Sequence, residues 1–115
     1  MMSPMAYDED LANRVRELLA EEVAVTERAM FGGLAFLVHG HMAVAVSGQG
    51  GLLVRVGADG AAAALVRPHA RQAEMRARPM RGWLRVAPQG VRTKAQLARW
   101  VASGRGFAAT LPPKG

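Results

Sequence analysis

The stretch LAFLVHGHMAVAV, residues 34–46, decides the fold that this sequence predicts. Two apolar runs flank the dipeptide His39-Gly40, and this pattern is typical of two antiparallel strands joined by a two-residue turn. Such turns require positive φ angles, which glycine adopts freely and histidine tolerates better than most residues. We therefore expect a β-hairpin with its turn at His39-Gly40.

Both faces of this predicted hairpin are apolar, although a strand with one face in water normally alternates apolar and polar residues. Strict alternation places the following side chains on one face: Leu34, Phe36, Val38, Met42, Val44 and Val46. The other face then carries Ala35, Leu37, Ala43 and Ala45. In a two-layer fold the helices cover only one face, so we expect a second copy of the chain to cover the other and form a homodimer. The last helix of the chain is the alternative cover.

A glycine pair precedes the hairpin in the segment RAMFGGLAF, residues 28–36. A phosphate-binding glycine turn leaves a strand and opens a helix, whereas this pair runs into an apolar strand. We therefore interpret Met30, Phe31, Gly32 and Gly33 as structural residues. The glycines supply a bend or bulge at the start of the sheet, or let another backbone approach closely.

Three helices are predicted around the strands from spacing and end signals. Apolar residues recur at helical intervals after an acidic start, which predicts a helix over residues 8–22. Asp59 is the expected N-cap of a second, alanine-rich helix that Pro68 ends. Residues 93–96, Thr-Lys-Ala-Gln, have the form of a capping box and open a third helix. Two glycines weaken this helix, and two consecutive prolines end it.

Further strands extend the sheet on the far side of a glycine-rich loop, SGQGG, at residues 47–51. Residues 52–56 form a strand that makes the hairpin a three-stranded meander. Two short strands follow the second helix, at residues 73–76 and 82–86, with RPMRG (residues 78–82) as the turn between them. The resulting order is α-β(3)-α-β(2)-α. Because helices and antiparallel strands are mixed rather than strictly alternating, we predict an α+β fold in two layers with a mainly antiparallel sheet.

Length and composition describe one globular domain, residues 1–115, with residues 1–6 expected to be a flexible leader. Half of the residues are hydrophobic, which argues against disorder. The sequence has no cysteine, which excludes disulfides, thiolate catalysis and cysteine-based zinc sites. No apolar run reaches the roughly 18 residues of a membrane helix, and the N-terminus turns acidic without an apolar signal-peptide core. We expect a cytoplasmic protein with no membrane partner.

Charge is distributed unevenly along the chain, whose net charge is +6. Residues 1–57 carry four basic and seven acidic side chains, a net charge of −3, whereas residues 58–115 carry eleven basic and two acidic side chains, a net charge of +9. Such asymmetry is typical of proteins that bind an acidic partner or nucleic acid. The alternative is compositional, because the chain is rich in Ala, Gly and Arg.

No pattern in the sequence predicts a catalytic, cofactor-binding or metal site. His39 and His41 form the only close histidine pair, and a metal site needs three or four ligands, so we interpret them as residues of a hairpin tip. The serines are Ser3, Ser47 and Ser103, and none stands in a recognisable arrangement with a histidine and an acid. We favour a protein that is not an enzyme, with an unrecognised activity as the alternative.

The basic half contains the stretch Pro79-Met80-Arg81-Gly82-Trp83. One interpretation is a turn in which the proline and glycine set the backbone geometry and the tryptophan packs on the sheet. The other is a recognition surface for a partner or a stacked base. Alternation places Trp83 and Arg85 on one face of their strand and Leu84 and Val86 on the other. The candidate interaction surface comprises Arg76, Arg78, Arg81, Trp83 and Arg85.

Several blocks in order resemble the N-terminal domain of the TfoX family, which is named for a bacterial regulator of natural competence. These blocks are AYDEDLANRVRELL (residues 6–19), RAMFGGLAFLVHGHMAVAVS (28–47), LLVRVG (52–57), RPMRGWLRV (78–86) and RWVASGRGFAATLPPK (99–114). The resemblance implies a two-layer fold with the order derived above, and structural roles for the motif residues Met30, Phe31, Gly32, Gly33, Pro79, Met80 and Gly82. The founding regulators carry a second, C-terminal domain, so this sequence is most similar to stand-alone members.

Three functional hypotheses follow from these observations. The first is a cytoplasmic regulatory module that acts through protein partners in transcriptional regulation, a role that the resemblance implies. The second is weak, sequence-independent nucleic-acid binding through the basic half, with contacts to phosphate. The third is an unrecognised small-ligand-binding or enzymatic role. A continuous basic stripe favours the second, an exposed apolar sheet face the first, and a pocket ringed by Arg and Trp the third.

Overall fold

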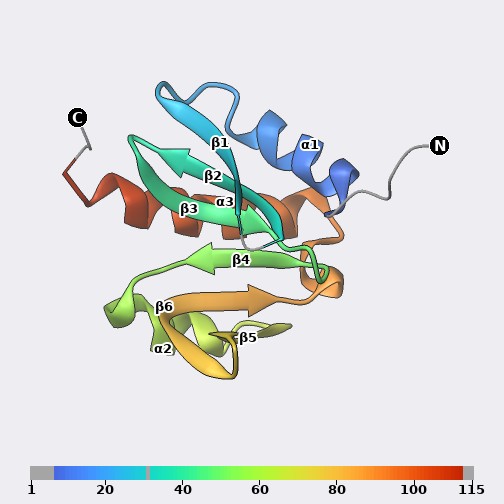
Figure 1. Cartoon of the computed structure of the whole chain (residues 1–115), viewed down its shortest axis with the longest axis vertical. Helices are drawn as coiled ribbons and strands as arrows, with labels where there is room; N and C mark the ends of the chain where they lie inside the picture. Colours follow the sequence, from blue (N-terminus) through green and yellow to red (C-terminus); the bar gives the residue numbers. More distant parts are fainter. Residues whose placement is uncertain (1–6, 31, 113–115) are drawn as a thin grey trace.

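The computed structural model describes residues 7–30 and 32–112, and it has an α+β fold with one antiparallel sheet (Figure 1). The strands follow the order β1-β2-β3-β4-β6-β5 across the sheet. Their bounds are β1 Val25–Met30, β2 Gly33–Val38, β3 His41–Val46, β4 Leu52–Arg55, β5 Ala70–Met75 and β6 Arg78–Val86. The helices are α1 Glu9–Leu18, α2 Ala58–Leu65 and α3 Lys94–Ala109, with a short 3-10 helix η1 at Pro88–Val91. The predicted fold class is confirmed. The expected leader, residues 1–6, lies outside the described residues.

β1 is a strand that the sequence did not predict. Its residues, VTERAM, are mostly polar and exposed, because β1 forms an edge of the sheet and pairs only with β2. An edge strand needs no continuous apolar pattern, so it gives little signal in the sequence. The β1–β2 hairpin brings Met30 opposite Gly33. The predicted bend therefore exists as the turn between two strands. Phe31 is outside the described residues.

The helices pack on one face of the sheet and enclose the main hydrophobic core, and α3 passes behind β2 and β3 in Figure 1. α1 and α3 contribute Val15, Leu97 and Trp100 to this core. Four strands of the sheet, β2, β3, β4 and β6, contribute buried apolar side chains: Leu34, Phe36, Val44, Val46, Leu52, Val54, Leu84 and Val86. Val25 of β1 and Ala70 of β5 pack at the margins of this core. One helix layer therefore covers one face of the sheet.

The helix ends confirm two of the predicted signals and correct one. Asp8 caps α1, because its carboxylate accepts a hydrogen bond from the Leu11 amide at 3.1 Å. Thr93 and Gln96 form the expected capping box of α3. Gly57, not Asp59, is the N-cap of α2, and Asp59 lies within the first turn. α1 also ends at Leu18, earlier than the predicted residue 22, because Leu19 is its C-cap and residues 19–21 form a turn.

The β2–β3 hairpin has the predicted turn but contains an unpredicted bulge. His39 and Gly40 both have positive φ angles, 52° and 85°. Phe36 pairs with Val44, whereas Leu37 pairs with Met42, so β3 has one extra residue, Ala43. A bulge moves the following side chains to the opposite face of the sheet. The assignment of Met42 to the face of Leu34 and Phe36 was therefore wrong, because Met42 packs with the cluster on the other face. The assignment of Ala43 to that other face was also wrong, because Ala43 packs with Val38 and Ala108.

The β5–β6 hairpin turns at Arg76-Ala77, so the predicted turn at RPMRG was wrong. Both turn residues have positive φ angles, 53° and 64°, without a glycine to signal the turn. RPMRG belongs to β6 instead. Pro79 is tolerated there because β4 pairs only with the part of β6 from Trp83 onward, which leaves the proline nitrogen without a partner strand on that side.

Close backbone contacts explain two glycines of the fold. A Cβ atom at Gly33 would lie 2.0 Å from the Val46 carbonyl oxygen, so only glycine lets β2 begin at that point. A Cβ atom at Gly104 would lie 2.4 Å from the Ala43 carbonyl oxygen. α3 therefore continues through Gly104, where the glycine allows the helix to approach the bulge of β3.

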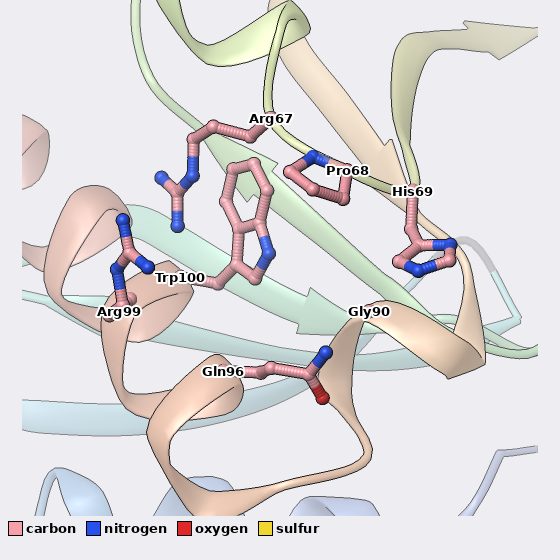
Figure 2. A pocket seen from close by; sticks show the side chains of 7 residues that line it. All are labelled: Arg67, Pro68, His69, Gly90, Gln96, Arg99 and Trp100. Carbon is pink, nitrogen blue, oxygen red and sulfur yellow. The ribbon is translucent and has the colours of Figure 1, made fainter.

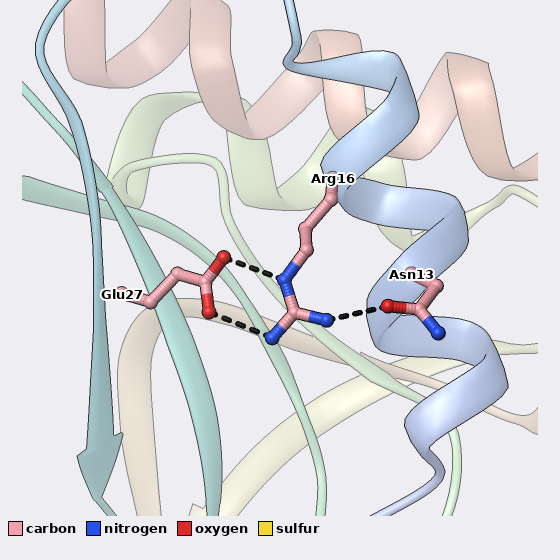
Figure 3. A network of polar contacts seen from close by, with 3 residues as sticks. All are labelled: Asn13, Arg16 and Glu27. Atoms are coloured by element: carbon pink, nitrogen blue, oxygen red, sulfur yellow. Dashed lines mark hydrogen bonds and ion pairs between the residues drawn. The ribbon is translucent and has the colours of Figure 1, made fainter.

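A polar network ties α1 to the edge strand β1 (Figure 3). Arg16 of α1 donates two hydrogen bonds to the Glu27 carboxylate, at 2.6 and 2.8 Å, and a third to the Asn13 side chain. The hydrogen bonds from Arg16 lower the pKa of Glu27. Glu27 therefore carries its charge on the helix-covered side, where α1 supplies the partner.

Candidate functional site

The second face of the sheet carries a separate apolar cluster to which no helix of the described residues contributes. Small and branched side chains form its base: Ala35, Leu37, Ala45, Leu53 and Ala73. Longer, partly exposed side chains pack over them: Met30, Met42, Met80 and Trp83. We call this side of the sheet the open face. The apolar second face that the sequence predicted is thus present, and flexible side chains of the chain itself cover part of it.

Arginines stand beside this cluster on β5 and β6. Arg71 lies directly opposite Arg85 across the two strands, and Leu53 of β4 lies on the other side of Arg85. The surface here is hollowed into a groove of about 440 Å³, lined by Gln49, Arg71, Gln72, Glu74, Arg76, Ala77 and Arg85. A neighbouring hollow of about 370 Å³ shares several of these residues and adds Leu53 and Met80. We call the two together the basic groove.

Arg85 is held in position by the loop between β3 and β4. Its guanidinium donates hydrogen bonds to the Ser47 hydroxyl and the Gly50 carbonyl oxygen, both at 3.1 Å, and to the Gln49 side chain at 3.3 Å. Burial, with a smaller contribution from Arg71, lowers the pKa of Arg85. The group stays protonated at neutral pH. The groove therefore presents a fixed, partly desolvated cation.

The positive charge of the groove is not balanced by the described part of the chain. Glu74 is the single acidic residue among the lining residues, against Arg71, Arg76 and Arg85. The two ion pairs among residues 7–30 and 32–112 join Arg16 to Glu27 and Arg105 to Glu22, both remote from the groove. Like charges directly opposed on a sheet destabilise it, so an anion bound between Arg71 and Arg85 would relieve a local repulsion.

A wide bulge in β6 shapes the apolar side of the groove. Between the pairs Gln72–Leu84 and Glu74–Pro79, β5 has one residue whereas β6 has four. The Gln72 side chain fills this irregularity, because its amide donates to the Met80 and Trp83 carbonyl oxygens at 2.8 and 3.2 Å. The bulge thereby turns Met80 and Trp83 onto the open face.

Gly82 anchors the same bulge to the start of α2. Its carbonyl oxygen accepts hydrogen bonds from the amides of Val56 and Gly57 at 2.8 and 3.0 Å. Gly82 is buried and has a φ of 84°, a conformation that other residues rarely adopt. The Arg55 guanidinium lies 6.0 Å from the centre of the Trp83 ring. Three of the motif residues, Pro79, Met80 and Gly82, thus build the strand and its bulge together with Trp83.

The five residues of the predicted interaction surface do not form one cluster. Arg76 and Arg85 line the basic groove, and Trp83 packs in the apolar cluster beside it. Arg78 and Arg81 are exposed but do not line the groove.

Sequence reasoning missed Arg71, Gln49 and Ser47 as neighbours of Arg85. A hairpin turning at Arg76-Ala77 with regular pairing would place Arg71 opposite Gly82, and the bulge moves it to Arg85. No residue type in the sequence signals the turn, and Gly82, which could have signalled the bulge, was interpreted as a turn residue.

A second cavity, of about 180 Å³, lies on the helix-covered side between the α2–β5 loop, η1 and α3 (Figure 2). Its lining comprises Arg67, Pro68, His69, Gly90, Gln96, Arg99 and Trp100. The two histidines of the predicted hairpin tip, His39 and His41, do not line this cavity. The His41 ring contacts the Pro112 carbonyl oxygen instead. Among the residues that the structure describes, no three His, Asp or Glu side chains are grouped so that they could hold a metal ion.

No helix in the described part of the chain is both long and apolar enough to cross a membrane. No curated protein and no solved structure matches the chain. The family model of the TfoX N-terminal domain matches residues 17–108, a range that includes β1 to β6, α2, all but the last residue of α3, and the basic groove. Because this match covers most of the sequence, the chain belongs to the TfoX N-terminal domain family.

Proposed function

We propose that this protein is a small cytoplasmic regulatory module that binds an acidic segment of a partner protein in the basic groove. The observation that carries the proposal is the opposed pair Arg71 and Arg85, which belongs to no ion pair among residues 7–30 and 32–112 and has Glu74 as the single carboxylate in its groove. Leu53 and Met80 give the groove an apolar floor next to these cations. A segment that combines carboxylates with apolar side chains complements both features. The relation to a family of competence regulators supports a role in transcriptional regulation.

The experiment measures binding of a fluorescent peptide with alternating Glu and Leu residues by anisotropy. Arg71→Ala and Arg76→Ala remove exposed groove cations, and Arg78→Ala and Arg81→Ala remove exposed cations of the same hairpin outside the groove. We expect the groove variants to weaken binding at least tenfold and the controls to change it less than twofold. Equal losses in all four variants, or no saturable binding of the peptide, would refute the proposal.

Nucleic-acid binding is the second candidate, because Arg78 and Arg81 add exposed positive charge to the same hairpin. Phosphate contacts would make affinity fall with salt, with a log–log slope of roughly −0.9 for each phosphate neutralised. No helix among the described residues contributes to the open face, so no base-reading helix lies there and unrelated duplexes should bind alike. A salt titration on two unrelated duplexes, repeated with the double variant Arg78→Ala/Arg81→Ala, separates this function from peptide binding.

A homodimer remains our proposal for the apolar part of the open face. The partly exposed Met30 and Met42 lie on β1 and β3, away from the arginines of β5, so a second copy has apolar surface to contact there. Light scattering at high micromolar concentration tests this proposal. We expect a dimer mass that Met42→Glu reduces to that of a monomer, and a monomer for the unchanged protein would contradict it.

A further inference from the structure

The cavity of Figure 2 plays no part in the proposed binding of an acidic segment. Three segments distant in the chain form it: the α2–β5 loop with Arg67 and His69, Gly90 of η1, and the first turns of α3 with Gln96 and Arg99. It lies on the helix-covered side of the sheet, because Trp100 in its wall belongs to the main core. It is therefore a second site, separate from the basic groove.

Arg67 is fixed in this cavity by contacts on two sides. Its guanidinium carbon lies 3.4 Å from the centre of the Trp100 ring, a stacked cation–π contact. Its Nη1 donates a hydrogen bond to the Ser103 hydroxyl at 3.0 Å, and that hydroxyl donates to the Arg99 carbonyl oxygen at 3.0 Å. The guanidinium is thus positioned before any ligand arrives, which lowers the entropy cost of binding.

A second guanidinium, that of Arg99, lies beside the first in Figure 2. Burial, with a smaller contribution from the charge of Arg99, lowers the pKa of Arg67. The residues that line the cavity include no carboxylate, and neither arginine belongs to an ion pair among the described residues. The cavity therefore concentrates positive charge in a partly desolvated place, where an anion is bound more strongly than at an open surface.

The size and walls of the cavity restrict the anion. Its volume of about 180 Å³ equals that of roughly six water molecules, so a compact group fits. Trp100 is 3% exposed and Arg67 already covers its ring, which leaves no aromatic face for a ligand to stack on. Two guanidiniums from different segments suit a group with several oxygen atoms, because each guanidinium fork can bind a pair of oxygens.

We propose that this cavity binds a phosphate group between the guanidiniums of Arg67 and Arg99. The group comes from inorganic phosphate or from a small phosphate monoester whose remainder extends into solvent. The His69 ring lies across the Trp100 ring from the two guanidiniums, and together with the Gln96 side chain it lines the rest of the cavity.

The test is isothermal titration of the protein with sodium phosphate and with glycerol 3-phosphate, at constant ionic strength held with chloride. The Arg99→Ala variant removes an exposed cation that lines the cavity. Arg92→Ala is the matched control, because Arg92 is also exposed, lies just before α3 and does not line the cavity. Arg67→Lys keeps the charge but removes the guanidinium fork, and circular dichroism checks that each variant is folded.

We expect saturable binding of at least one of the two ligands, weakened at least tenfold by Arg99→Ala and by Arg67→Lys and less than twofold by Arg92→Ala. Tighter binding of inorganic phosphate would identify the free ion as the ligand, and tighter binding of glycerol 3-phosphate a monoester. No saturable binding of either ligand at millimolar concentration would overturn the proposal. Equal weakening by Arg99→Ala and Arg92→Ala would also overturn it, because it would reflect net charge alone.

Discussion

The two faces of the sheet are built from different residues. The helix-covered face holds Phe36, Leu52 and Leu84 fully buried under α1, α2 and α3. The open face holds alanines under partly exposed methionines and Trp83, next to the opposed Arg71 and Arg85. The first face is complete within the chain, because helices supply matching apolar surface. The second face keeps adaptable side chains and unbalanced charge at its surface, which are properties of a binding surface rather than of a core.

The largest predicted effect compares large aromatic side chains on the two faces. Phe36→Ala should lower the free energy of unfolding by about 3–5 kcal/mol, because a fully buried ring leaves a cavity. Trp83→Ala should cost only about 1–2 kcal/mol, because part of its ring is already in water. Urea denaturation measures both changes. If Trp83→Ala costs as much as Phe36→Ala, the open face is a second core, and the comparison fails.

The next prediction concerns the helix-covered face and compares alanine substitutions at two glycines of α3. Gly104→Ala should destabilise the protein by about 1–3 kcal/mol, because the new Cβ would meet the Ala43 carbonyl oxygen. Gly106→Ala should stabilise it by about 0.5–1 kcal/mol, because position 106 has open space and alanine favours a helix. Thermal unfolding of both variants tests this, and a shift in the same direction for the two would contradict the close contact of α3 with β3.

A smaller effect is expected on the open face, where a substitution should raise the free energy of unfolding instead of lowering it. Arg71→Gln should stabilise the protein by about 0.5 kcal/mol, because it removes a like charge directly opposite Arg85. The gain should shrink as salt is raised, since screening weakens the repulsion. Arg78→Gln, at an exposed position opposite Met75, is the control. Destabilisation by Arg71→Gln would mean that the charges of Arg71 and Arg85 do not repel each other measurably.

The smallest predicted effect concerns the ion pair that joins α1 to β1. The pKa of Glu27 is lowered, so its contribution to stability is complete above its ordinary value of 4.5 and is lost as pH falls through the folded value. The melting temperature of the unchanged protein should therefore fall more steeply below pH 5 than that of Glu27→Gln. Glu21→Gln, an exposed acid between α1 and β1, is the control. Parallel pH profiles for Glu27→Gln and the unchanged protein would show that the pair contributes nothing.

Local signals in the sequence predicted the elements that depend on local physics. The His39-Gly40 turn, the Thr93–Gln96 capping box and the amphipathic first helix each follow from backbone preference or side-chain spacing within a few residues. The sequence also predicted the apolar second face, because the alternation of side chains along the two strands places apolar residues on both faces. The edge strand β1 was not, since its polar residues satisfy no burial pattern.

The candidate sites depended on long-range structure. The basic groove exists because a bulge in β6 places Arg85 opposite Arg71 and the β3–β4 loop holds it with Ser47. The cavity of Figure 2 exists because α3 brings Arg99 and Trp100 to a loop that carries Arg67. The sequence by itself determined the fold class, the main hairpin and the starts of α1 and α3, since each rests on neighbours in the chain. Only the tertiary structure decided which arginines meet, because strand register and helix docking are settled by packing between distant segments.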